Sequence, residues 1–128
     1  MNASTSTTTS FDEADLLHQE DCPVYFDDFE PLIKQGSLDG RCYVILEGSV
    51  EIKRNGRMLS MEGPGSIVGE MSLIDNGPAT ADVIATRPTV AIAISRNRFE
   101  ELVQEHPDFA IVVMKVITSR LRRTEKLN

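Results

Sequence analysis

Short apolar runs separated by turns fill the middle of the chain. The run Cys42–Leu46 is compact and apolar, and beyond it Val50 and Ile52 alternate with charged residues. This two-residue period is typical of a half-buried β-strand. The pair Asn55-Gly56 follows, and it predicts a type I′ hairpin turn, because both central residues of that turn need a positive φ.

The same pattern continues to residue 95. The segment Gly63-Pro64-Gly65 predicts another turn, and the apolar runs at 83–85 and 90–94 predict two further strands. Many short strands with glycine-containing turns between them are typical of a small β-sandwich or β-barrel. We therefore expect such a fold between residues 32 and 95.

The last third of the chain changes to a helical period. Ser95 is a plausible N-cap, and apolar residues follow it at helical spacing. Pro107 ends this first helix, and Asp108 is expected to cap a second one.

Eight of the nine residues from Phe109 to Ile117 are apolar, and five of the eight are Val or Ile, so a strand is an alternative. A helix is favoured because the amphipathic stretch 118–123 continues it. A helix that is apolar nearly all round must be covered on more than one side. We expect its own β-domain on one side and a second copy of the chain on the other, giving a homodimer through the helix around Phe109–Leu121.

Composition and charge argue against several classes of protein. The chain has 128 residues, which fits one domain, and a net charge of −7, which disfavours a basic surface for direct DNA binding. No apolar run is long enough to span a membrane, and the chain begins without a secretory signal. Two cysteines without a CxxC spacing make the cytoplasm the default location. Residues 1–10 are expected to be a disordered tail, because seven of the ten are Ser or Thr.

An enzyme is the least favoured class. A metal-dependent oxygenase on a small barrel needs two or three clustered histidines with a carboxylate. The chain has only His18 and His106, which lie far apart in sequence. We therefore expect no catalytic residues and no metal site.

The segment from Gly63 to Val83 carries the most specific chemistry. Gly69 allows a sharp turn, and Glu70–Ile74 can form one helical turn whose free N–H groups would favour an anion. Thr80 could turn its hydroxyl toward the same place. Glycine turns before short helices are common, so this pattern is weak by itself.

Five motifs occur along the chain in a defined order and spacing. They are Leu32-Ile33-Lys34-Gln35-Gly36, Tyr43-Val44-Ile45-Leu46-Glu47-Gly48-Ser49-Val50, Gly63-Pro64-Gly65, Gly69-Glu70-Met71-Ser72-Leu73 and His106-Pro107. Together they resemble the cyclic nucleotide-binding domain, the Crp/Fnr-like sensor module of the catabolite activator protein and of cyclic-nucleotide-dependent kinases and channels. The resemblance covers about residues 29–124. It implies a mainly β fold, an eight-stranded jelly-roll barrel with flanking helices and a C-terminal dimerisation helix.

The resemblance also implies a domain plan and a binding site. The β-barrel domain with its flanking helices is expected over residues 11–107 and the C-terminal helix over 108–128, and residues 69–83 would form the phosphate-binding cassette. The implied ligand-binding residues are Gly69, Glu70, Met71, Ser72, Leu73, Ala79, Thr80 and Thr124. In this scheme Glu70 accepts a hydrogen bond from a ribose hydroxyl, Thr80 contacts the phosphate, and Thr124 lies near the purine.

One position departs from the family pattern. The family places an arginine after the cassette turn, and this chain has Ala79 there, so residues 69–83 contain three carboxylates and no positive charge. A charge-assisted hydrogen bond contributes about 1.5–3 kcal/mol, so its loss weakens binding about 10- to 150-fold. The sequence therefore disfavours cAMP or cGMP as ligands and implies no certain cofactor. Arg41, Arg87 or a partner subunit could supply a cation, but nothing in the sequence places one there.

Two functional hypotheses remain open after this comparison. One is a stand-alone regulatory domain whose cassette is degenerate or altered in specificity. The alternative is a genuine cAMP or cGMP sensor that signals to a protein partner by rearranging its C-terminal helix. A guanidinium beside Ala79 would contradict the idea of an emptied pocket.

Overall fold

The computed structural model describes residues 23–127, with side chains not described for 120, 121 and 123–127. In chain order its elements are β1 (Pro23–Phe26), β2 (Pro31–Ile33), β3 (Arg41–Glu47), β4 (Val50–Arg54), β5 (Arg57–Glu62), β6 (Ile67–Val68), α2 (Glu70–Asp75), β7 (Asp82–Ala85), β8 (Thr89–Ser95), α3 (Arg96–Glu105) and α4 (Pro107–Leu127). The predicted tail at residues 1–10 and His18 lie outside the described residues.

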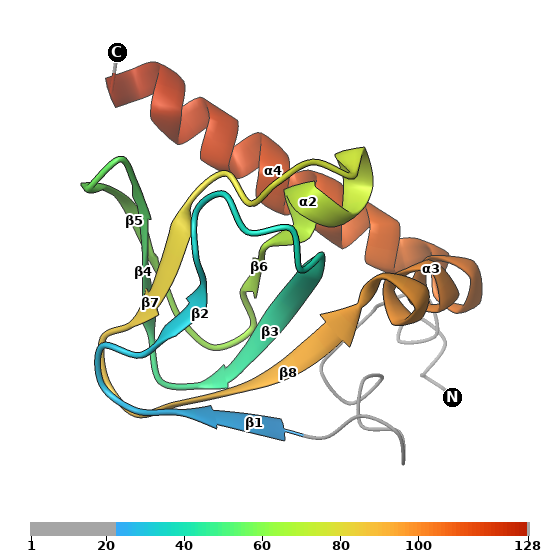
Figure 1. The fold of residues 1–128 in the computed structure, drawn as a ribbon. Helices are drawn as coiled ribbons and strands as arrows, with labels where there is room; N and C mark the ends of the chain where they lie inside the picture. The colour runs from blue at the N-terminus through green and yellow to red at the C-terminus, as the bar shows by residue number, and fades with distance from the viewer. Residues whose placement is uncertain (1–22, 128) are drawn as a thin grey trace, which may run out of the picture.

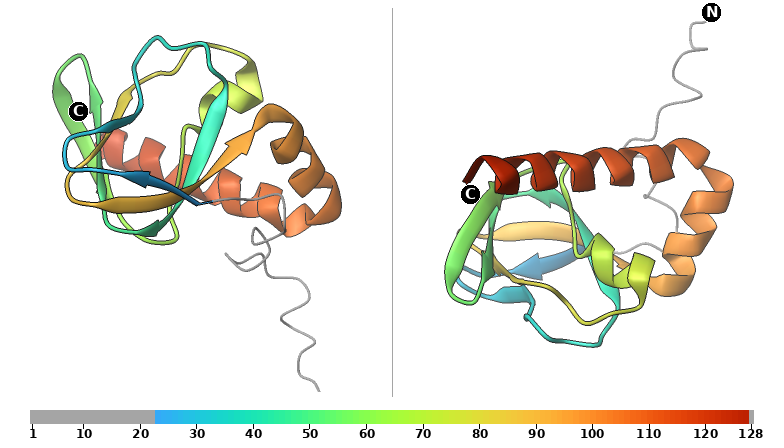
Figure 2. Two further views of the ribbon diagram at one scale, coloured as in Figure 1. Left: turned by 60° about the horizontal axis from the view of Figure 1, so that its bottom comes forward. Right: turned by 90° about the horizontal axis from the view of Figure 1, so that it is seen from above.

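The eight described strands form two antiparallel sheets of four. The strand orders are β1-β8-β3-β6 and β2-β7-β4-β5. The two sheets face each other, with α2 at one end and α4 running along one side (Figures 1 and 2). The predicted mainly β, jelly-roll architecture with C-terminal helices is confirmed, as two facing sheets.

Local sequence signals explain the turns. Asn55 and Gly56 have φ values of 53° and 79°, which is the pair of positive angles that the type I′ hairpin between β4 and β5 requires. Gly48 has a φ of 94°, and a methyl group there would lie 2.5 Å from the carbonyl oxygen of Pro88. Glycine at position 48 therefore lets the β3–β4 turn pass close to the β7–β8 turn.

The helices agree with the predicted positions, apart from one cap. The Ser95 hydroxyl accepts a hydrogen bond from the Arg98 N–H at 3.2 Å, as expected of the N-cap of α3. The expectation that Asp108 caps the next helix was wrong. Helix α4 begins at Pro107, and Asp108 lies in its first turn. Proline is suited to the first helical position because its missing N–H has no partner to lose there.

The apolar side chains form two clusters. The helix-side cluster lies between one sheet and α3 and α4, and its buried members are Cys42, Val44, Ile67, Leu73, Ile92, Ile94, Phe99, Leu102, Phe109 and Val113. The sheet-interior cluster lies between the sheets, and its buried members are Phe26, Leu32, Tyr43, Ile45, Val50, Ile52, Val68, Ala81, Val83, Ala85 and Ala91. The run 109–117 is helical, so the alternative of a strand is wrong. No described helix is both long enough and apolar enough to cross a membrane.

Candidate functional site

A cavity of about 210 Å³, here called the cassette cavity, opens between α2, the segment 79–83 and the β4–β5 hairpin. Its lining residues are Ile33, Ile52, Arg54, Leu59, Ser60, Gly69, Glu70, Met71, Ser72, Ala79, Thr80, Ala81, Val83 and Ile117. The lining is mostly apolar with a few polar groups, as is typical of small-molecule sites.

The backbone around Gly69 shapes the entrance to α2. Gly69 has a φ of 83°, in the left-handed region, and it precedes the first helical residue, Glu70. A methyl group at Gly69 would lie 2.5 Å from Ile33 Cδ1 and 2.8 Å from the carbonyl oxygen of Arg41. The predicted sharp turn and short helix are both present, and only glycine fits the close approach to β3.

Glu70 places a carboxylate in a nearly water-free part of the cavity. Its side chain is 2% exposed. Burial, and secondly the charge of Glu70, raise the pKa of the neighbouring Cys42 thiol far above its usual value, so this thiol stays protonated. A buried carboxylate is an acceptor that favours a hydroxyl donor and repels an anion. Glu70 therefore suits the sugar of a nucleotide better than its phosphate.

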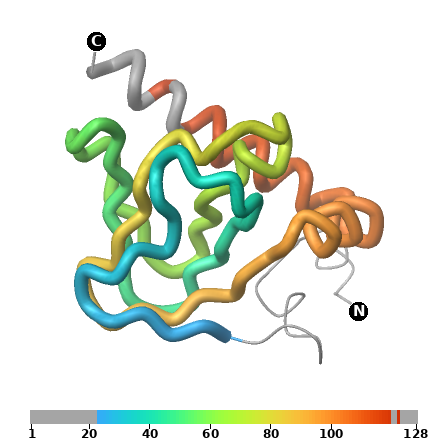
Figure 3. The backbone as a smooth tube through the Cα atoms, viewed as in Figure 1, coloured from blue at the N-terminus to red at the C-terminus, as the bar shows by residue number. Residues whose placement is uncertain are grey.

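Hydrogen bonds to two other segments fix the cassette backbone. The Ala79 N–H donates to the Ser37 carbonyl at 2.9 Å, and the Gly36 N–H donates to the Ala79 carbonyl at 2.8 Å. These bonds hold the segment around Ala79 beside the loop that follows β2, as the tube in Figure 3 shows. At the end of α2, Arg96 Nη1 of α3 donates to the Leu73 carbonyl at 3.1 Å. The cassette is thus tied both to the sheet and to the helices.

Arg54 brings a positive charge to this site from outside the cassette. Its Nε donates to the Thr80 carbonyl oxygen at 3.1 Å, and among the described residues that line the cassette cavity it is the one basic side chain. The strand pairing explains its position, because Lys53 of β4 pairs with Asp82 of β7, and Arg54 comes one residue later. Its remaining N–H groups have no hydrogen-bond partner among the described residues.

The structure brings most of the predicted site residues together. Gly69, Glu70, Met71, Ser72, Ala79 and Thr80 all line the cassette cavity. Leu73 does not line it, since its side chain belongs to the helix-side cluster. The side chain of Thr124 lies outside the described residues.

Sequence reasoning missed Arg54. The signal was present, because Arg54 continues the alternation of the inward-facing Val50 and Ile52 at two-residue spacing. The hairpin signal Asn55-Gly56 follows it directly, and Arg54 was read only as a residue flanking that turn. The suggested substitute Arg41 lies outside the cassette cavity, in the neighbouring hollow. Arg87 lines neither space.

Comparisons with known proteins agree with this geometry. The family described as the cyclic nucleotide-binding domain matches residues 23–106. The chain belongs to this family. It is 30% identical over 107 residues to the CRP-like cAMP-activated global transcriptional regulator of Mycobacterium tuberculosis, a match spanning 80% of this chain and 48% of that protein.

Solved structures of the family have the same fold as this domain. The crystal structure of Thermus thermophilus catabolite activator protein matches with a TM-score of 0.76 at 30% identity, over 88% of this chain and 55% of that one. A cyclic nucleotide-binding domain from Methylobacillus flagellatus matches with a TM-score of 0.72 at 26% identity, over 81% of this chain and 64% of that one. The chain spans about half the length of the curated relatives that it matches.

Proposed function

We propose that this domain is a regulatory binding module that takes a cyclic nucleotide, or a close relative of one, in the cassette cavity with altered specificity. The single observation that carries the proposal is Arg54, whose guanidinium reaches the cassette at Thr80. A charge-assisted hydrogen bond from arginine to a phosphate contributes about 1.5–3 kcal/mol. Arg54 can therefore supply the cation that Ala79 does not.

The altered specificity follows from where that cation lies. The family pattern places its arginine at position 79, on the cassette, whereas Arg54 approaches from the end of β4. An anion held by Arg54 and Thr80 lies on the β4 side of the cavity, while Glu70 favours a hydroxyl donor near α2. A ligand must match both groups at once, so its phosphate and sugar positions differ from those a position-79 arginine would select.

The role of each predicted residue is part of this proposal. Gly69, Met71 and Ser72 form the α2 wall, Glu70 receives a sugar hydroxyl, and Ala79 and Thr80 flank the phosphate. A cytoplasmic protein without direct DNA binding fits the charge of −7 and the free, buried Cys42.

Calorimetric titration with cAMP and with cGMP tests the proposal. Arg54→Ala is expected to weaken binding about 10- to 150-fold, far more than the loss of its one hydrogen bond to Thr80 lowers the stability of the unliganded protein. Arg57→Ala is the matched control, because it removes an exposed arginine of the same hairpin that does not line the cavity. Absence of heat and of thermal stabilisation with both nucleotides up to millimolar concentration would contradict a cyclic nucleotide as the ligand.

A sensor that signals through its C-terminal helix is the second candidate function. Ile117 of α4 lines the cassette cavity, so a bound ligand contacts the helix directly. Ligand binding is then expected to change amide hydrogen exchange in residues 108–119 of α4. Exchange that changes in the cassette but stays constant in α4 would remove this candidate.

We also propose a homodimer through α4. Phe109 and Val113 face the protein's own core at 0% and 2% exposure, whereas Ile111 and Met114 are 49% and 56% exposed. An outward apolar strip on a helix is typical of an interface with a second copy. Sedimentation velocity is expected to show a dimer for the native chain and a monomer for Ile111→Glu/Met114→Glu, with Leu38→Glu, at a position 79% exposed and outside α4, as the control. A native chain that sediments as a monomer at high concentration would refute the dimer.

A further inference from the structure

A second hollow lies next to the cassette cavity, on the other side of Ala79. It has a volume of about 360 Å³ and is bordered by the end of β2, the loop 34–40 and the start of β3. The two spaces share three lining residues, Ile33, Ser72 and Ala79. Two of the three shared side chains are small, so the two spaces meet at a narrow wall between α2 and the segment around Ala79.

The second hollow contains two cations. Lys34 and Arg41 both line it, and Asp39 is the one carboxylate among its described lining residues. Neither Lys34 nor Arg41 forms an ion pair with any other part of the chain that the structure describes. Arginine offers a planar fork of donors that matches phosphate, and lysine adds a compact positive charge. The chemistry of the hollow therefore favours a phosphate group.

Residue 79 is one of the residues at which a ligand spanning both spaces would cross from one to the other. The Ala79 main chain is fixed by its two hydrogen bonds to the loop at Gly36 and Ser37, so only its side chain can vary at the junction. A methyl group takes up little space at this wall, whereas an arginine side chain would occupy much more. Ala79 thus lies between a cavity lined by Arg54 and a hollow lined by two further cations.

We propose that the natural ligand is a nucleotide with two phosphate groups, of which one binds near Arg54 and the other binds Lys34 and Arg41 in the second hollow. This inference rests on the proposed function, since it assumes that a nucleotide occupies the cassette cavity. Because the two sets of cations lie on opposite sides of Ala79, phosphates on the two ends of the ribose fit them better than a single cyclic phosphate. Adenosine 3′,5′-bisphosphate is the probe with this chemistry.

Calorimetric titration of the full chain compares adenosine 3′,5′-bisphosphate with cAMP, 3′-AMP and 5′-AMP. The bisphosphate is expected to bind about tenfold or more tightly than any of the three monophosphates, because it gains a second charge-assisted contact. If cAMP binds and the bisphosphate binds no more tightly, the inference is wrong and the proposed function stands. If none of the four binds, both are wrong.

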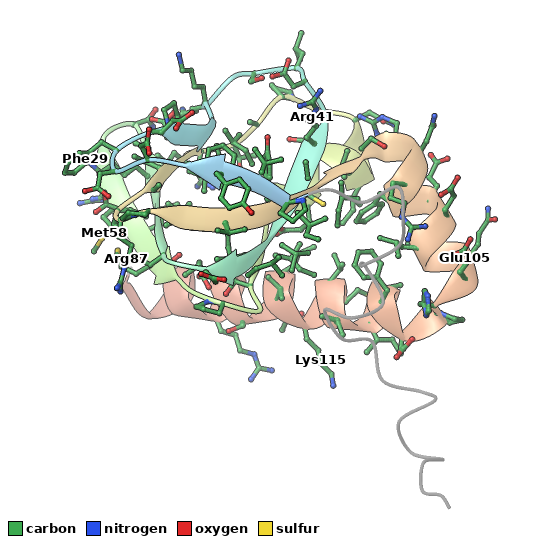
Figure 4. The ribbon with its side chains drawn as sticks, turned by 90° about the horizontal axis from the view of Figure 1, so that it is seen from below. Phe29, Arg41, Met58, Arg87, Glu105 and Lys115 are labelled. Atoms are coloured by element: carbon green, nitrogen blue, oxygen red, sulfur yellow. The ribbon has the colours of Figure 1, made fainter. Side chains whose placement is uncertain are left out.

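Variants of the second hollow localise the second phosphate. Arg41→Ala is expected to weaken bisphosphate binding about tenfold and to leave cAMP binding unchanged. Arg87→Ala is the matched control, because it removes an exposed arginine that lines neither space and lies well away from Arg41 in Figure 4. Lys34→Ala gives a second test if Arg41→Ala lowers the melting temperature. Equal effects of Arg41→Ala and Arg87→Ala on the bisphosphate would overturn the inference.

Discussion

The helix-side cluster and the sheet-interior cluster differ in the size of their side chains and in whether a cavity opens beside them. The helix-side cluster is filled by large side chains, and the Phe99 and Phe109 rings pack edge to face with centroids 5.4 Å apart. The sheet-interior cluster includes alanines at positions 81, 85 and 91, and the cassette cavity opens beside it. Of these alanines Ala81 lines the cavity, which Arg54 and Glu70 also line.

This difference predicts that stability and ligand binding depend on separate regions of the molecule. Removing atoms from a closely packed core lowers the free energy of unfolding, because the cavity left behind collapses only in part. A cavity that already exists can exchange contacts with water for contacts with a ligand. Substitutions should therefore affect mainly stability on the helix side and mainly binding at the cassette. Four experiments test that division.

Phe109→Ala should have the largest effect. Phe109 is 0% exposed in the helix-side cluster, so its truncation is expected to lower the free energy of unfolding by about 3–5 kcal/mol. Urea denaturation measures this change. Phe29→Ala is the control, because Phe29 is 79% exposed and its loss should change stability by less than about 0.5 kcal/mol. Similar losses for the two variants would contradict the division.

Ala79→Arg should strengthen binding of cyclic nucleotides. The new guanidinium would project into the space at the junction of the two hollows and add a charge-assisted bond, so affinity should rise about 10- to 150-fold. Calorimetry measures the gain, and Ala79→Met controls for added side-chain bulk without charge. No gain would mean that the phosphate does not bind beside residue 79.

Gly69→Ala should damage the cassette and stability together. An alanine at a left-handed φ costs about 1–2 kcal/mol, and its methyl group would also press on Ile33 and the Arg41 carbonyl. Gly56→Ala is the matched control, because Gly56 has a φ of 79° but nothing within 4 Å of an added methyl group. Denaturation and nucleotide titration of both variants separate the two contributions. If Gly56→Ala weakens nucleotide binding as much as Gly69→Ala does, nucleotide binding does not depend on the close contacts at Gly69.

The Cys42 thiol should give the smallest effect, seen only at alkaline pH. Burial raises its pKa, so the folded chain keeps the proton, while the unfolded chain releases it above the ordinary thiol pKa of 9.0. Stability is then fully present below about pH 9 and falls by about 1.4 kcal/mol for each pH unit above it. Denaturation in a Cys22→Ser background measures this slope. The added substitution Cys42→Ala should remove it, and an unchanged slope would contradict the assignment.

The sequence determined the local structure of this protein. Alternation in β4, the Asn55-Gly56 pair and the Ser95 cap each depend on interactions within a few residues, so β4, the hairpin and α3 could be predicted, whereas β1 at Pro23–Phe26 lay outside the expected strand region. The cassette motif predicted Gly69 and α2 for the same reason. Proline at a helix start was misjudged, because Pro107 can either end one helix or begin the next.

Only the tertiary structure decided where the basic side chains lie relative to the cassette. Arg54 reaches Thr80 because β4 pairs with β7, and Lys34 and Arg41 share a hollow because the loop 34–40 folds back to the start of β3. Such contacts join residues far apart along the chain, so they depend on strand order and register, which no local pattern records. The sequence therefore predicted the cassette motif, and the fold placed Arg54 beside it.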